Sequence, residues 1–140
     1  MEKVSFATCN LLNLNLPGRE IYSDRDGWSQ EVYERKVEWT SRLISQMSAD
    51  VWGFQELWHY KALEAVFNPA KLKDNYQLLA PVDHNGDGII CAGAVRKEII
   101  KGKPEWIEEF PKKFRLESSG SDRQTPEILV SIFKYAPYDS

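Results

Sequence analysis

A predicted helix at residues 31–48 lies between two apolar runs, residues 3–12 and 51–56, and this order constrains the fold more than any other feature. The helix would bury one stripe of apolar side chains, and the two runs are typical of buried strands. Parallel neighbours in a sheet need a crossover connection, so strand, helix and strand in this order favour a parallel pair. The apolar stripe comprises Tyr33, Val37, Ile44 and Met47.

Further elements follow along the chain and favour a layered α/β (α+β) domain over residues 1–140. Ser29 is the predicted N-cap of the first helix. A second helix is predicted to stop at Asn68-Pro69, and turn residues near Asn85-Gly86 favour a hairpin between two later strands. The predicted ranges are 58–67 for the second helix, 76–80, 89–96 and 128–133 for strands, 97–116 for short edge strands and 117–126 for a loop.

Composition excludes several classes of protein. An apolar fraction of 42% over 140 residues is typical of a folded domain with a core. A net charge of −3 argues against a dedicated nucleic-acid binder. The chain enters a predicted strand without a leader sequence, so we expect a cytoplasmic protein, with a removed signal peptide as the alternative. Cys9 and Cys91 are predicted to be reduced and buried, with a disulfide between them as the alternative.

Polar side chains stand at the carboxyl ends of the first two predicted strands. Glu56 follows the apolar run that begins at Val51, and Asn10 comes late in the first run. Parallel neighbours bring such ends to one edge of a sheet, where α/β proteins place their sites. Asn13 is the competing choice for the amide, because the sequence does not fix the register. Glu56 could instead serve only as a helix N-terminal carboxylate.

These two segments resemble the opening half of the endonuclease/exonuclease/phosphatase (DNase I-like) superfamily. The resemblance rests on Thr8-Cys9-Asn10 and on Asp50-Val-Trp-Gly-Phe-Gln55-Glu56, in this order. It covers nearly the whole chain, although its motifs are short. Three further segments agree with it: a helix at 35–47, a Gly-rich strand that runs into a basic residue at 88–96, and a strand at 128–135.

The resemblance implies a Mg²⁺-dependent phosphoesterase, with Mn²⁺ as the alternative cation. Glu56 would be the metal ligand, and Asn10 would contact the water shell of the metal or the scissile phosphate. His59, three residues after Glu56, is a candidate phosphate contact, with an exposed helix histidine as the alternative. Relatives act on nucleic acids, phosphoinositides, sphingomyelin or small phosphodiesters, so nuclease and phosphatase activities are both open.

The sequence also departs from the family pattern. It has Leu57 and Trp58 where members often have a basic residue, and it contains neither the later Gly-Asp-x-Asn turn nor the terminal Asp-His pair. We therefore expect the N-terminal half of a two-sheet sandwich flanked by helices, inactive alone. Its partner would be the missing C-terminal half or a second copy bound through the exposed sheet face. The alternative is a non-catalytic module that binds a protein or calcium.

Two other segments carry weaker signals. Residues 83–88 match the first half of an EF-hand loop, but Ala94 stands where the bidentate Glu belongs, so a hairpin turn is favoured. Residues 96–115 combine seven basic and four acidic side chains with aromatics. That combination is compatible with nucleic-acid contact, although solvated edge strands explain it with fewer assumptions.

Overall fold

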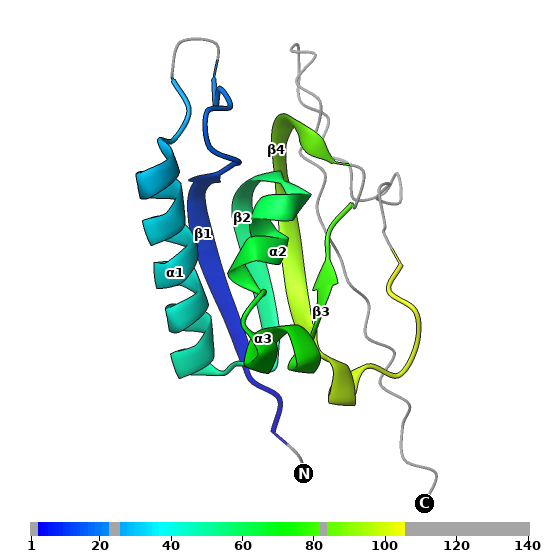
Figure 1. Ribbon diagram of the computed structural model, residues 1–140. Coiled ribbons are helices and arrows are strands. Elements are labelled where there is room, and N and C mark those ends of the chain that lie inside the picture. The colour runs from blue at the N-terminus through cyan, green and yellow to red at the C-terminus, as the bar shows by residue number, and fades with distance from the viewer. Residues whose placement is uncertain (1–2, 23–25, 82–83, 106–140) are drawn as a thin grey trace, which may run out of the picture. The chain divides into compact units, whose positions relative to one another are not determined.

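The computed structural model describes residues 3–22, 26–81 and 84–105, and within them it contains a mixed sheet of four strands with three helices. This arrangement confirms the predicted α/β class. Every element lies in one compact unit that ends at Ile100. In chain order the elements are β1 (Phe6–Leu14), α1 (Gln30–Met47), β2 (Val51–His59), α2 (Tyr60–Val66), α3 (Ala70–Asn75), β3 (Tyr76–Leu79), β4 (Asn85–Arg96) and a 3-10 turn, η1 (Lys97–Ile99) (Figure 1).

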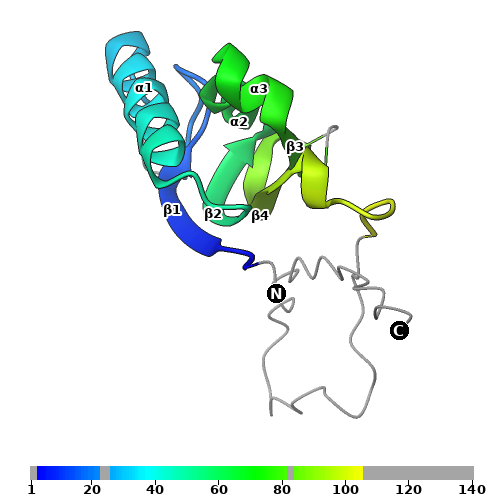
Figure 2. The same cartoon turned by 90° about the horizontal axis from the view of Figure 1, so that it is seen from below.

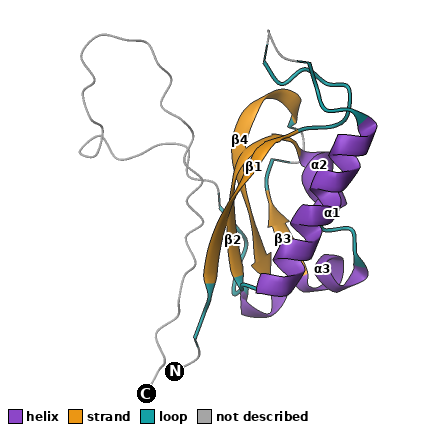
Figure 3. Ribbon diagram, turned by 90° about the vertical axis from the view of Figure 1, so that its left-hand side faces the viewer, coloured by secondary structure: helices purple, strands orange, loops and turns teal. Residues whose placement is uncertain are grey.

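The strands run in the order β1-β2-β4-β3 across the sheet. β1 and β2 are parallel, as predicted, and α1 forms the crossover between them. β4 runs antiparallel to both β2 and β3. All three helices cover the same face of the sheet (Figures 2 and 3). The carboxyl ends of β1 and β2 therefore lie at one edge, at the top of Figure 1.

Helix α1 begins and ends as its sequence dictates. Ser29 caps its N-terminus by accepting a hydrogen bond from the backbone N–H of Val32 at 3.3 Å, which confirms the predicted cap. Ser48 ends it in the left-handed conformation, with φ of 54°. Ile44 is buried, but Met47 is 57% exposed, so that part of the predicted stripe is wrong. With 3.6 residues per turn, Met47 in the last turn lies beside the buried face of the helix and not on it.

The core lies between the helices and one face of the sheet. Trp52 and Phe54 of β2 are buried there, and the Phe54 ring meets Phe67 edge-on at a centroid distance of 6.0 Å. Leu63 and Val66 of α2 are fully buried against the same layer. Each such side chain contributes roughly 1.5–3 kcal/mol through removal from water. This burial fixes which face of the sheet carries the helices.

The other face of the sheet is not covered by any described helix (Figure 3). Phe6 of β1 is 71% exposed on it, which agrees with the expectation of an exposed sheet face. Cys91 on β4 is exposed for the same reason, which makes its predicted burial wrong. Cys9 is half-buried, and both thiols are free, as predicted.

Several predicted boundaries shift in the structure. β2 continues to His59, α2 starts at Tyr60, and α3 was not predicted at all. The predicted hairpin is confirmed, because β3 and β4 pair antiparallel. The end of its predicted turn at 83–88 is wrong, because β4 already begins at Asn85 and pairs there with His59. The first half of β4 thus extends beyond the short β3 and pairs there with β2 alone. The edge strands predicted from residue 97 are not found as far as 105, where the chain forms η1 and then no further strand. The rest of that segment, the loop at 117–126 and the strand at 128–133 lie outside the described residues.

None of the helices in the described part of the chain is long and apolar enough to span a membrane.

Candidate active site

Both parallel strands leave regular geometry at the edge where their carboxyl ends meet. Asn10 pairs with Gln55, but the next register pair is Leu14 with Leu57, so three residues of β1 face one residue of β2. Leu12, Asn13 and Glu56 take positive φ angles of 50°, 55° and 60° to close this bulge. Non-glycine residues in that region cost roughly 1–3 kcal/mol each and concentrate at functional sites. The strain marks this edge as a candidate site.

The carboxylate of Glu56 is held at the bulge by two donors from β1. The side-chain amide of Asn10 donates to Glu56 Oε1 at 2.7 Å, and the backbone N–H of Asn13 donates to Oε2 at 3.2 Å. Asn10 is itself fixed, because its Oδ1 accepts from the backbone N–H of Leu12 at 2.7 Å. The predicted proximity of Asn10 and Glu56 is therefore confirmed. The roles assigned to them remain predictions.

Asn13 contributes more than the backbone N–H that it donates to Glu56. Its carbonyl accepts from the indole N–H of Trp28 at 2.8 Å. Its side-chain Oδ1 accepts from the Tyr22 hydroxyl at 3.1 Å and from the Trp58 indole at 3.0 Å. The sequence offered Asn13 as an alternative to Asn10, whereas the structure uses both side chains for different contacts.

Lys36 of α1 is a functional candidate that sequence reasoning missed. Its ammonium group donates to the carbonyl of Leu12 at 3.1 Å and lies 4.6 Å from the centroid of the Trp28 ring. Burial lowers the pKa of Lys36, and the negative charge of Glu56 opposes this shift. One signal was present in the sequence: Lys36 follows Tyr33 by three residues, at the side of the apolar stripe, where a lysine needs a partner.

His59 lies at the end of β2 and caps α2. Its Nδ1 accepts from the backbone N–H of Lys61 at 3.1 Å, so the neutral ring carries its proton on Nε2. The ring is 8% exposed, which makes the alternative of an exposed helix histidine wrong. Burial lowers the pKa of His59, and the positive charges of Arg19, Lys61 and His84 lower it further. His59 is therefore a neutral N–H donor at neutral pH.

Arg19 and His59 both lie close to Gly86. A Cβ at Gly86 would meet Arg19 Nη1 at 3.4 Å and His59 Cδ2 at 3.5 Å, which are ordinary contacts, and Asn15 Oδ1 more tightly at 3.2 Å. Its φ of +98° is the stronger reason for glycine at this position. Arg19 Nη1 also donates to the carbonyl of Asn85 at 2.5 Å. The positive charge of this guanidinium repels a divalent cation at the same carbonyl. The segment also forms a strand, whereas an EF-hand site needs a loop. The geometry therefore does not favour calcium at Asn85 and Gly86; Asp83 lies outside the described residues.

The donor set at Glu56 fits a hydrated hard cation. A carboxylate offers about four lone-pair positions, and the two hydrogen bonds from β1 occupy only part of them. Mg²⁺ keeps several waters and needs one or two protein carboxylates. Within residues 3–22, 26–81 and 84–105 there is no cluster of three or more His, Cys, Asp or Glu side chains. Glu56 would thus be the single carboxylate ligand contributed by this part of the chain.

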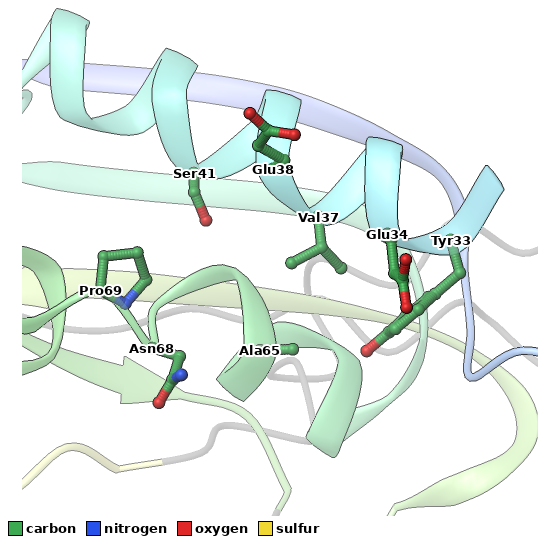
Figure 4. Close-up of a pocket in the computed structure, with 8 residues that line it drawn as sticks. All are labelled: Tyr33, Glu34, Val37, Glu38, Ser41, Ala65, Asn68 and Pro69. Atoms are coloured by element: carbon green, nitrogen blue, oxygen red, sulfur yellow. The ribbon is translucent and has the colours of Figure 1, made fainter. Parts of the chain in front are cut away.

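A hollow of about 350 Å³ lies elsewhere, between α1 and α2 (Figure 4). None of its lining residues belongs to the edge that carries Glu56, and its two glutamates, Glu34 and Glu38, are exposed. Ser41 in its wall already donates to the carbonyl of Val66. We assign the chemistry to the edge with strained backbone and convergent donors, because the hollow has neither. It is lined by Tyr33, Glu34, Val37, Glu38, Ser41, Ala65, Asn68 and Pro69.

Comparison of the chain with models of known protein families gives no match, and comparison with curated proteins gives none either.

Proposed function

We propose that this chain carries part of the active site of a Mg²⁺-dependent phosphoesterase of the DNase I-like kind, with Mn²⁺ as an alternative cation. The reaction would be hydrolysis of a phosphodiester or phosphomonoester. A sheet with helices on one face is compatible with one layer of a two-sheet sandwich, the fold that this proposal requires (Figure 2).

One observation carries the proposal: the Glu56 carboxylate is held by the Asn10 amide, at 2.7 Å, where two parallel strands end. A carboxylate and an amide on opposite faces or ends of the sheet could not share one ion and its water shell. Here they are in direct contact. A carboxylate with a fixed orientation also loses less side-chain entropy when it binds a cation.

Each residue of the site would have a distinct role. Glu56 would bind the cation, which offsets the charge that develops at phosphorus. Asn10 would keep Glu56 oriented and contact the water shell or the phosphate through its remaining hydrogen-bonding positions. The Nε2–H of His59 would donate to a phosphate oxygen, and Arg19 beside it adds positive charge. The described residues bring no base to Glu56, so cation binding is the property to measure first.

Calorimetric titration of the full chain with MgCl₂ and MnCl₂ tests the proposal. We expect saturable binding that the Glu56→Gln variant loses, because an amide oxygen carries no charge to attract the ion. The control is Glu98→Gln, a change of the same kind at an exposed glutamate of η1, which should bind as the wild type does. Absence of binding in the wild type, or unchanged binding in Glu56→Gln, would refute the proposal.

A second candidate function is association with a protein partner or a second copy through the uncovered face of the sheet. Phe6 is 71% exposed there. A large exposed apolar side chain on an uncovered sheet face is a feature of interfaces. Sedimentation analysis of the wild type and of Phe6→Ser tests this function. A concentration-dependent dimer that the variant abolishes would support it, and a monomer at all concentrations would contradict self-association.

A further inference from the structure

We infer that Asn13 is a positioning residue, which fixes the Glu56 carboxylate in the orientation that binds the cation. This inference rests on the proposed function and extends it to a residue that makes no contact with the substrate. It starts from the four hydrogen bonds of Asn13, which join β1, β2 and the loop between β1 and α1.

The first step is the direct bond. The backbone N–H of Asn13 reaches Glu56 Oε2 at 3.2 Å, while Asn10 occupies Oε1. A single donor would leave the carboxylate free to rotate about its last torsion. Two donors on different oxygens define the plane of the group. The direction of the Asn13 N–H therefore decides where the remaining lone pairs of Glu56 point.

The second step is what holds that N–H in place. Asn13 has φ of 55°, and its carbonyl and side chain accept three hydrogen bonds from aromatic residues. The donors are Tyr22 and Trp58 to Oδ1 and Trp28 to the carbonyl. The Tyr22 and Trp58 rings also meet edge to face, at 5.3 Å and 86°. This set of contacts is rigid because each donor belongs to a ring with few rotatable bonds.

The third step is why this residue is asparagine. Asn tolerates the left-handed conformation better than most residues. Its amide oxygen has two lone pairs, which match the two donors from Tyr22 and Trp58. Aspartate would accept the same bonds but would place a second negative charge beside Glu56. This position therefore uses two properties of asparagine: its tolerance of the left-handed conformation and the two lone pairs of its uncharged amide oxygen.

The Asn13→Gly variant separates the role of the side chain from that of the backbone. Glycine adopts φ of 55° without strain and keeps the N–H, but it removes both bonds to Oδ1. We expect Mn²⁺ affinity to fall by roughly 10-fold, the low end of the range for loss of an outer-shell partner, because the N–H remains but is no longer held in place. The matched control is Ser48→Gly, at the left-handed residue that ends α1 and precedes β2, at the opposite end of that strand from Glu56. It should leave affinity unchanged.

A metal-free measurement distinguishes this inference from the proposed function. In NMR spectra of the metal-free protein, the amide proton of residue 13 should shift between the wild type and Glu56→Gln, and this shift should be smaller when both proteins also carry Asn13→Gly. If the wild type does not bind Mn²⁺ but its residue 13 amide still responds to Glu56, the phosphoesterase proposal is refuted and the contact between Asn13 and Glu56 stands. Asn13→Gly with wild-type affinity, or an amide proton of residue 13 that does not respond to Glu56→Gln, would overturn the positioning role.

Discussion

Asp50, which immediately precedes β2, joins three strands through its carboxylate. Asp50 Oδ2 accepts from the backbone N–H of Ser5 at 2.8 Å and from the Ser5 hydroxyl at 2.7 Å. Asp50 Oδ1 lies 3.1 Å from Arg96 Nε at the end of β4, and the two side chains are 23% and 21% exposed. We therefore expect Asp50→Ala to destabilise the fold from the end opposite the candidate site.

The expected loss follows from these contacts. A hydrogen bond to a charged group contributes roughly 1.5–3 kcal/mol, and the low end applies because the carboxylate is partly exposed. Two such bonds give about 3 kcal/mol, and the ion pair with Arg96 adds at most about 1 kcal/mol. Urea unfolding followed by circular dichroism should show a free energy of unfolding lower by about 3 kcal/mol.

A control and a pH series make this prediction sharper. Asp74→Ala removes an exposed carboxylate of α3 and should change stability by less than about 0.5 kcal/mol. The hydrogen bonds from Ser5 lower the pKa of Asp50, and the Arg96 charge lowers it further. The stabilisation is therefore complete above the unfolded-state pKa and is lost as the pH falls below about 4. If Asp50→Ala matched Asp74→Ala at neutral pH, the argument would be wrong.

Three further predictions concern other parts of the described unit. The pKa of His59 is lowered in the folded chain, so the unfolded chain binds a proton at higher pH, and the free energy of unfolding should fall as the pH drops below about 6.5. The urea midpoint should depend less on pH in His59→Asn, which retains a capping acceptor for α2. Cys91 is exposed, whereas burial raises the pKa of Cys9; a thiol reagent should therefore modify Cys91 first, and Cys91→Ser should leave only the slow reaction. Ser29→Ala should lower the free energy of unfolding by about 1 kcal/mol in the same urea assay, and an unchanged value would contradict the cap.

The sequence predicted the part of the site that depends on strand order. Asn10 and Glu56 were expected at one edge of the sheet, because the carboxyl ends of parallel strands joined by a helix share an edge. Their 2.7 Å contact agrees with that expectation, although the register that produces it was not predictable. The class of fold was predictable for the same reason.

The rest depended on information that local patterns do not contain. The bulge at Leu12 and Asn13 arises where β1 and β2 lose register, and the periodicity of either strand alone does not reveal it. Burial of His59 was missed because β2 runs three residues further than the polar pair suggested. Exposure of Cys91 follows from a sheet whose described helices cover one face only, which the apolar content of β4 could not reveal.

Paramagnetic broadening by Mn²⁺ tests the central claim most directly, that Glu56 holds a divalent cation at the edge where β1 and β2 end. The indole N–H groups of Trp28 and Trp58 both donate to Asn13 beside Glu56, whereas Trp52 lies four residues earlier in β2, about 13 Å away along the strand. Substoichiometric Mn²⁺ should broaden the indole signals of Trp28 and Trp58 first, and Glu56→Gln should abolish this selectivity. Equal broadening of all three indoles, or selective broadening that persists in Glu56→Gln, would contradict the account.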